Sequence, residues 1–100
     1  MKVEFRKKKL EKCFNDQKQA VKEFGDQVAR KYIQRIQIIQ ATETLDDLIA
    51  LPGLRCHALK GKRQGQYAVK LTGFYRLIFT VDGDYLNVVM IEEVSKHYDD

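Results

Sequence analysis

Apolar residues recur every three or four positions through residues 7–40, which is the period of an amphipathic helix. Residues 7–14 predict one or two helical turns, and Asn15-Asp16 then interrupts the pattern and can cap the next helix. The helical period continues through residues 17–40, with apolar side chains at Val21, Phe24, Val28, Tyr32, Ile36 and Ile39. Gly25 lies inside this stretch, where a glycine weakens or bends a helix.

Shorter elements lie on either side of this helical region. Residues 1–5 predict a strand, because apolar and polar side chains alternate there. Residues 44–51 predict a short helix that begins with a capping pair, Thr44 and Asp47, and ends at a Pro-Gly sequence. Residues 52–65 contain three glycines and predict an irregular segment.

The period changes to two in the last third of the chain, which predicts strands over residues 67–72, 75–81 and about 85–91. Asp82-Gly83 between the last two strands is typical of a two-residue hairpin turn. Such a turn predicts four cross-strand pairs, namely Val81 with Asp84, Phe79 with Leu86, Leu77 with Val88 and Tyr75 with Met90.

The order of these elements predicts an α+β fold in one domain spanning residues 1–100. The chain has 100 residues, of which 44% are hydrophobic, and a chain of this size builds one core. We expect the N-terminal short strand and the helices to pack on one face of a small antiparallel sheet, whose C-terminal part is a three-stranded meander.

Alternation along the strands also predicts which side chains share a face. If Tyr67, Val69 and Leu71 face the core together with Tyr75 and Leu77, then Lys70 lies opposite Arg76 on the other face. Like charges directly opposite each other destabilise a strand pair. An anion bound between the two side chains would relieve that repulsion.

Charge is distributed unevenly along the chain, which carries a formal net charge of +4. No Asp or Glu occurs between Leu48 and Val81. The same interval contains His57 and six cations, namely Arg55, Lys60, Lys62, Arg63, Lys70 and Arg76. Two interpretations remain open, because a polyanion could dock here or the cations could form a solvated face of one sign.

Several classes of protein are not expected from this composition. The two histidines and two cysteines are scattered and give no ligand set, so we expect no metal and no other cofactor. The beginning, MKVEFRKKKLEK, lacks the apolar region of a secretory signal, and no apolar run is long enough to span a membrane. We therefore expect a cytoplasmic protein with free thiols and no membrane partner.

A group of Lys, Arg, His and Tyr side chains without carboxylates suits one reaction in particular. In RNA the 2′-OH can attack the adjacent phosphate if a base removes its proton, cations stabilise the phosphorane, and an acid protonates the leaving 5′-oxygen. This route needs no metal ion, and DNA lacks the nucleophile. Tyr and His near the C-terminus, in Lys96-His97-Tyr98, could join the group if the tail folds back, and could stack on unpaired bases.

The stretch LRCHALKGKRQGQYAVKLTGFYRLIF, followed by EEVSKHY, resembles the HigB-type toxins of the RelE/ParE superfamily. Their pattern is a His-x-Leu-Lys-Gly-x-Arg-x-Gly loop, a strand, a second strand with an aromatic-Arg pair, and a short His/Tyr tail. The resemblance covers most of the chain, and it implies a RelE-like fold and a toxin that cleaves mRNA on the translating ribosome.

The resemblance implies catalytic roles for His57, Lys60, Arg76, His97 and Tyr98. As a hypothesis, Lys60 or His57 is the base, Arg76 stabilises the phosphate in the transition state, and His97 or His57 is the acid. Tyr98 would stack on or orient a nucleobase. The resemblance assigns contacts with the mRNA or rRNA backbone to Arg55, Lys62, Arg63 and Lys70. A second arginine of the family pattern, between the loop and Arg76, has no clean match in this sequence, and Lys70 or Arg63 is the candidate to replace it.

The implied partners are mRNA, the ribosome with its rRNA, and a HigA-type helix-turn-helix antitoxin. Two further functions stay open. One is a ParE-like inhibitor of DNA gyrase on the same fold, which would need no groups for proton transfer. The other is an RNA-binding module without catalysis, and a toxin that has lost its activity is also possible.

Overall fold

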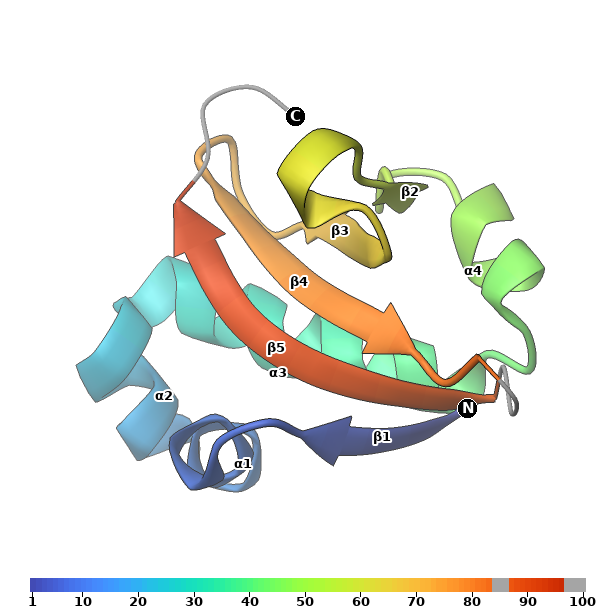
Figure 1. Cartoon of the computed structure of the whole chain (residues 1–100). Helices are drawn as coiled ribbons and strands as arrows, with labels where there is room; N and C mark the ends of the chain where they lie inside the picture. The colour runs from blue at the N-terminus through green and yellow to red at the C-terminus, as the bar shows by residue number, and fades with distance from the viewer. Residues whose placement is uncertain (84–86, 97–100) are drawn as a thin grey trace.

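The computed structural model describes residues 1–83 and 87–96, in which helices cover one face of a five-stranded sheet (Figure 1). Within these residues the helices are α1 (Lys8–Asn15), α2 (Gln17–Phe24), α3 (Asp26–Ala41), α4 (Leu45–Ala50) and the 3-10 turn η1 (Gly61–Arg63). The strands are β1 (Lys2–Phe5), β2 (His57–Ala58), β3 (Gln66–Lys70), β4 (Tyr75–Val81) and β5 (Val88–Lys96). The predicted α+β class is therefore confirmed.

The sheet is mixed rather than antiparallel. Its strand order is β1-β5-β4-β3-β2, and β1 pairs with β5 in parallel while the other neighbours are antiparallel. The prediction of an antiparallel sheet was wrong at this edge, because alternation of side chains does not specify the direction of a strand. The helices between β1 and the later strands carry the chain back so that a parallel pairing is possible.

The helical stretch over residues 17–40 forms two helices, α2 and α3, rather than one. Gly25 separates them with φ +83° and ψ 163°, a conformation that is essentially restricted to glycine. Both predicted caps are present, since Asp16 Oδ1 accepts from the Lys18 N–H at 3.0 Å and Thr44 Oγ1 accepts from the Asp47 N–H at 3.1 Å. These bonds satisfy N–H groups that the first turn of a helix leaves without partners.

The main core lies between α3 and the sheet. Tyr32, Ile36 and Ile39 of α3 are fully buried with Leu77 and Phe79 of β4. The predicted face is confirmed, because the alternate residues of β3 and β4 face this core. A second, small cluster of Leu59, Ala68 and Ile78 lies apart from it.

No helix in the described part of the chain is long and apolar enough to cross a membrane.

The predicted pairing of the last two strands was wrong. Val81 pairs with Val89, Leu77 with Val94 and Tyr75 with Lys96, so the connection is longer than a two-residue turn. The predicted partners Asp84 and Leu86 lie outside the described residues. The sequence VVMI at residues 88–91 is apolar on both faces, so alternation could not fix the parity of this strand.

A β-bulge between Ile78 and Phe79 of β4 and the facing β5 residues shifts the register along this pair. Phe79 lies opposite Ile91, whereas Ile78 lies opposite Glu93, so that Glu92 is the extra residue. Bulges change the direction of side chains locally. Here the bulge keeps Val94 opposite Leu77 on the core side while Glu92 and Glu93 both reach partners away from the core.

Candidate functional site

The register of three strands places His57, Lys70 and Arg76 on the same face of the sheet. His57 pairs with Ala68 and Lys70 pairs with Arg76, and Ala68 and Lys70 are two residues apart on β3. Ala68 belongs to the small cluster, so this face is the one opposite α3, and we call it the outer face. From the spacing of strands and residues, the Cα atoms of His57 and Arg76 are about 12 Å apart. The two residues therefore lie on neighbouring rows of one face, as a shared site requires.

Arg76 is held firmly at the beginning of β4. Only 9% of the residue is exposed, and its Nη1 donates to the Thr72 carbonyl at 2.7 Å and to the Tyr75 carbonyl at 3.1 Å. The predicted pairing of Lys70 with Arg76 is confirmed. The guanidinium thus helps to shape the β3–β4 turn in addition to bringing positive charge to the outer face.

The imidazole of His57 is oriented by the backbone two residues earlier. Its Nδ1 lies 2.8 Å from the Arg55 carbonyl oxygen. A carbonyl oxygen only accepts hydrogen bonds, so Nδ1 carries the proton and Nε2 has the free lone pair in the neutral ring. Arg55 itself adopts φ +53°, an uncommon conformation for a residue other than glycine. The ring is therefore set with a possible proton acceptor at Nε2.

Lys60 and Lys62 are exposed on a loop that Leu59 attaches to the outer face. Leu59 packs with Ala68 and Ile78, and its N–H donates to the Gln66 carbonyl at 2.9 Å. Lys60 is the residue that precedes η1. The loop thus projects two ammonium groups beside the strand residues that carry His57 and Arg76.

A carboxylate enters this group of cations, contrary to the expectation from the sequence. The predicted backbone-contact residue Arg63 donates from Nη1 to Gln66 Oε1 at 2.9 Å, and the same Nη1 lies 3.4 Å from Glu93 Oε2. Glu93 comes from β5, outside the acid-free interval, and lies opposite Ile78 on the outer face. Arg63 therefore ties the loop to β5, and part of its charge is offset by Glu93.

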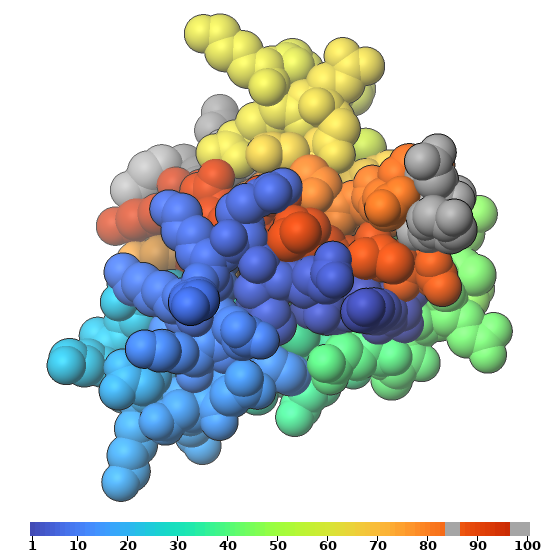
Figure 2. All heavy atoms as spheres, turned by 60° about the horizontal axis from the view of Figure 1, so that its bottom comes forward, coloured from blue at the N-terminus to red at the C-terminus, as the bar shows by residue number. Residues whose placement is uncertain are grey.

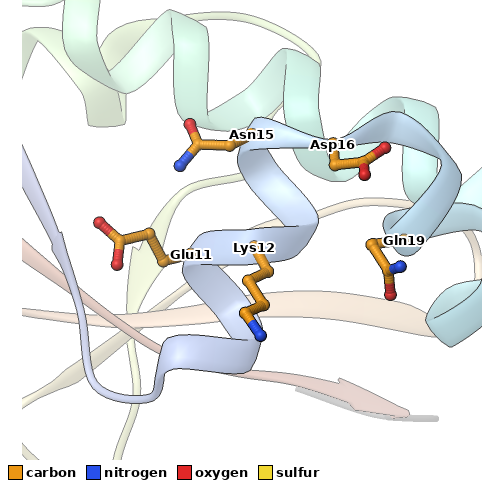
Figure 3. Close-up of a pocket in the computed structure, with 5 residues that line it drawn as sticks. All are labelled: Glu11, Lys12, Asn15, Asp16 and Gln19. Carbon is orange, nitrogen blue, oxygen red and sulfur yellow. The ribbon is translucent and has the colours of Figure 1, made fainter.

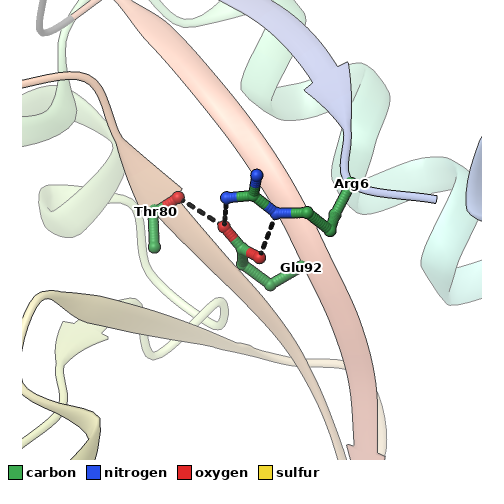
Figure 4. Close-up of polar contacts among 3 residues, drawn as sticks. All are labelled: Arg6, Thr80 and Glu92. Atoms are coloured by element: carbon green, nitrogen blue, oxygen red, sulfur yellow. Dashed lines mark hydrogen bonds and ion pairs between the residues drawn. The ribbon is translucent and has the colours of Figure 1, made fainter.

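A second acid of β5, Glu92, is bound toward the β1 edge of the sheet (Figure 4). Its carboxylate accepts from Arg6 Nε at 3.0 Å and Arg6 Nη2 at 2.9 Å, and from the Thr80 hydroxyl at 2.7 Å. The hydrogen bonds from Arg6 hold the pKa of Glu92 below its ordinary value, against the opposing effect of burial. Glu92 thus connects the segment after β1 to β4 and β5.

His97 and Tyr98, the other two predicted catalytic residues, lie outside the described residues. The predicted backbone-contact residue Arg55 is exposed, and Lys70 is half-buried. Within residues 1–83 and 87–96, no group of three or more His, Cys, Asp or Glu side chains could hold a metal ion. The thiol of Cys56 is buried, which raises its pKa to about 11, and Cys13 is also a buried free cysteine.

Two residues near the site were not among the predicted site residues. Arg35 of α3 donates from Nε to the Lys70 carbonyl at 3.0 Å and so holds the end of β3. Burial lowers the pKa of this guanidinium. Phe74 lies in the β3–β4 turn with 58% of the residue exposed. An aromatic residue directly after Gly73 was a signal for an exposed ring of the kind that stacks on bases.

Comparison with known proteins identifies the family. The model of the HigB-like toxins, described as the RelE-like toxin of the type II toxin-antitoxin system HigB, matches residues 3–94. Toxin HigB-1 of Vibrio cholerae is 31% identical over 91 residues, which cover 90% of this chain and 95% of that protein. The chain belongs to the HigB-like toxins. The resemblance predicted from residues 54–79 and the EEVSKHY sequence after them is confirmed.

Solved structures show the same fold in more distant toxins. The YoeB/ParE toxin from Agrobacterium tumefaciens is 16% identical with a TM-score of 0.64, over 98% of this toxin and all of that chain. A chain of the YoeB-YefM complex from Staphylococcus aureus is 18% identical with a TM-score of 0.60, over 98% of both chains. YafQ from Escherichia coli is 19% identical with a TM-score of 0.59, over 94% of this toxin and 90% of YafQ. These likenesses support the RelE-like fold of the toxin.

Proposed function

We propose that this type II toxin is an endoribonuclease that cuts mRNA on the ribosome without a metal ion. The observation that carries the proposal is the placement of His57, Lys70 and Arg76 on one face, beside the loop that presents Lys60. Such a face offers a proton acceptor and several cations to a phosphodiester. RNA supplies the nucleophile itself, as its 2′-OH.

In the proposed reaction the 2′-oxygen forms a bond to phosphorus while the bond from phosphorus to the 5′-oxygen breaks. His57 Nε2, or Lys60 in its neutral form, takes the proton from the 2′-OH. Arg76 stabilises the charge on the phosphorane, because a guanidinium held in advance by Thr72 and Tyr75 needs little reorganisation. His97 or His57 gives a proton to the 5′-oxygen, and the products are a cyclic phosphate and a 5′-hydroxyl.

The remaining cations would hold the RNA backbone. Lys62 and Arg55 are exposed and Lys70 is half-buried beside Arg76, so each can meet a phosphate. Arg63 would act mainly by fixing the loop through Gln66 and Glu93. Tyr98 would stack on or orient a nucleobase of the RNA.

A HigA-type helix-turn-helix antitoxin is the proposed protein partner, in the cytoplasm where translating ribosomes occur. The similar structure from S. aureus is itself a complex of YoeB with YefM. Co-expression with the antitoxin encoded next to the toxin gene, followed by co-purification through a tag on the antitoxin, tests this pairing. Recovery of the tagged antitoxin without the toxin would contradict it.

Primer extension on cellular mRNA after induction tests the cleavage. We expect new 5′ ends with wild-type toxin, and their loss in His57→Ala and Lys60→Ala. Lys31→Ala changes a half-buried residue of α3, the helix that packs on the opposite face of the sheet, and should cut like the wild type. Arg76→Ala is less decisive, because it also removes two hydrogen bonds from the β3–β4 turn.

The other candidate functions predict different results from the same induction. Intact mRNA together with DNA damage would show a gyrase inhibitor and would overturn the proposal. Intact mRNA bound to the toxin, with affinity that falls steeply as salt rises, would show a binding module without catalysis.

A further inference from the structure

A second concentration of positive charge lies on α1 and α2. The lysine groove is a hollow of about 440 Å³ between these helices, lined by Lys8, Lys9, Lys12, Lys22, Gln19, Cys13 and Glu23. In Figure 1 α1 follows β1 at one edge of the sheet, whereas the loop with η1 joins β2 and β3 at the other edge. In Figure 2 most of the surface of α1 and α2, in blue, lies below this loop, in yellow, which projects at the top of the view. The groove is thus distinct from the outer face that carries the proposed cleavage site.

Most of the positive charge in the groove is not offset within it. Lys9 Nζ pairs with Glu23 Oε2 at 2.8 Å across the two helices. Among the residues that the structure describes, Lys8, Lys12 and Lys22 form no ion pair. Three exposed ammonium groups with one sign of charge in one concave surface raise the local concentration of an anion.

Apart from Glu23, the acids near the groove are directed elsewhere. A neighbouring hollow shares Lys12 and Gln19 with the groove and also contains Glu11, Asn15 and Asp16 (Figure 3). In Figure 3 Glu11 extends from α1 away from Gln19. Asp16 lies where the two helices meet, and its carboxylate caps α2 through the Lys18 N–H. Neither acid lines the groove itself.

We infer that the lysine groove binds phosphates of an RNA backbone and gives the toxin a second contact with RNA outside its cleavage face. The inference rests on the proposed function in taking RNA as the ligand. No aromatic side chain lines the groove, so it offers phosphate contacts without base stacking and should not select a sequence. An acidic protein segment fits less well, because protein interfaces are anchored by aromatic or apolar residues and the one apolar liner, Cys13, is buried.

Salt-dependent binding of two variants with equal charge tests the inference. Lys12→Gln/Lys22→Gln changes the groove, whereas Lys2→Gln/Lys31→Gln removes the same charge from β1 and α3. The probes are fluorescein-labelled oligouridylate and oligoadenylate, with poly-L-glutamate as competitor, and circular dichroism checks that both variants are folded. The logarithm of the binding constant for single-stranded RNA falls with the logarithm of salt concentration, and each phosphate contact contributes about 0.7 to the magnitude of this slope. Loss of two contacts in the groove variant should therefore reduce the magnitude of the slope by about 1.4. The groove variant should then bind RNA about 25-fold more weakly than the wild type at 0.1 M salt.

Both RNA probes should show the same loss of affinity in the groove variant. The control variant should retain nearly the wild-type dependence of affinity on salt. Equal slopes in the two variants would overturn the inference, and so would competition by poly-L-glutamate at the same charge concentration as RNA. Failure here is distinguishable from failure of the proposed function. A toxin that cuts mRNA but shows no effect of the groove variant refutes the groove alone, whereas a toxin that binds RNA through the groove without cutting it refutes the cleavage alone.

Discussion

Truncation of Leu59 should reduce the function of the toxin more than it reduces the global stability of the fold. It is 9% exposed and packs in the small cluster with Ala68 and Ile78, on the face of the sheet away from α3. Leu59→Ala removes the apolar anchor of the loop that carries Lys60 and Lys62. This loop is also held by the Leu59–Gln66 backbone bond, by the Arg63–Gln66 side-chain bond and by the partly exposed pair of Arg63 with Glu93.

The size of the effect follows from the burial of this side chain. Truncation of a buried leucine to alanine costs about 2–5 kcal/mol, while a partly exposed ion pair contributes less than about 1 kcal/mol. The loss should therefore lower the free energy of opening of the loop by roughly 2 kcal/mol, which increases its open population about 30-fold. The main core does not include Leu59, so most of the fold should persist.

Leu54→Ala is the matched control, because Leu54 is 4% exposed and belongs to the main core. It should lower the melting temperature by roughly 10 °C or more, since about 1 kcal/mol corresponds to 4–8 °C in a chain of this size. Leu59→Ala should change the melting temperature less but accelerate tryptic cleavage after Lys60, Lys62 and Arg63, read by mass spectrometry, and reduce mRNA cleavage. Equal loss of melting temperature in both variants without faster cleavage in the loop would refute this reasoning.

Three further predictions concern strain, a thiol and a carboxylate. Gly25→Ala should cost about 1–3 kcal/mol in urea unfolding because alanine is strained at φ +83°, and an unchanged midpoint would contradict this. Cys56, with its pKa raised to about 11, should resist iodoacetamide at neutral pH in the folded toxin and react in urea, so equal rates would contradict its burial. Glu92 has a lowered pKa when folded, so its contribution to stability is present above the pKa of the unfolded carboxyl and is lost as pH falls through the folded value. The difference in melting temperature between wild type and Glu92→Gln should therefore shrink from neutral pH to about pH 3, and a constant difference would contradict the shift.

Much of the fold could be predicted from local patterns, and the exceptions have physical reasons. Helix boundaries followed from caps and from Gly25, whose ability to take a positive φ turned a weakened helix into two. The β3–β4 register followed from clear alternation, which put Lys70 opposite Arg76 as predicted. The β5 register did not, because residues 88–91 are apolar on both faces and the bulge at Glu92 then changes the parity.

The candidate site was predictable only in part for a related reason. The order of His57, Lys60 and Arg76 in the sequence was enough to suggest one face, and the register places the two strand residues there. The absence of acids between residues 48 and 81 was not a property of the folded surface, since Glu93 arrives from β5. Contacts such as Arg35 with the Lys70 carbonyl depend on packing between distant segments, which no local pattern encodes.

The β5 register also determines where acids meet cations on the outer face. Both acids of the bulge have partners that hold the fold, since Glu92 binds Arg6 and Thr80 while Glu93 binds the loop through Arg63. One row further along the sheet, the β5 residue opposite Arg76 is Ser95, and Lys70 lies opposite Arg76 on its other side. Like charges directly opposite each other in a strand pair repel, and an anion bound beside them is attracted to both. The proposed function would therefore place the scissile phosphate of RNA at this end of the outer face.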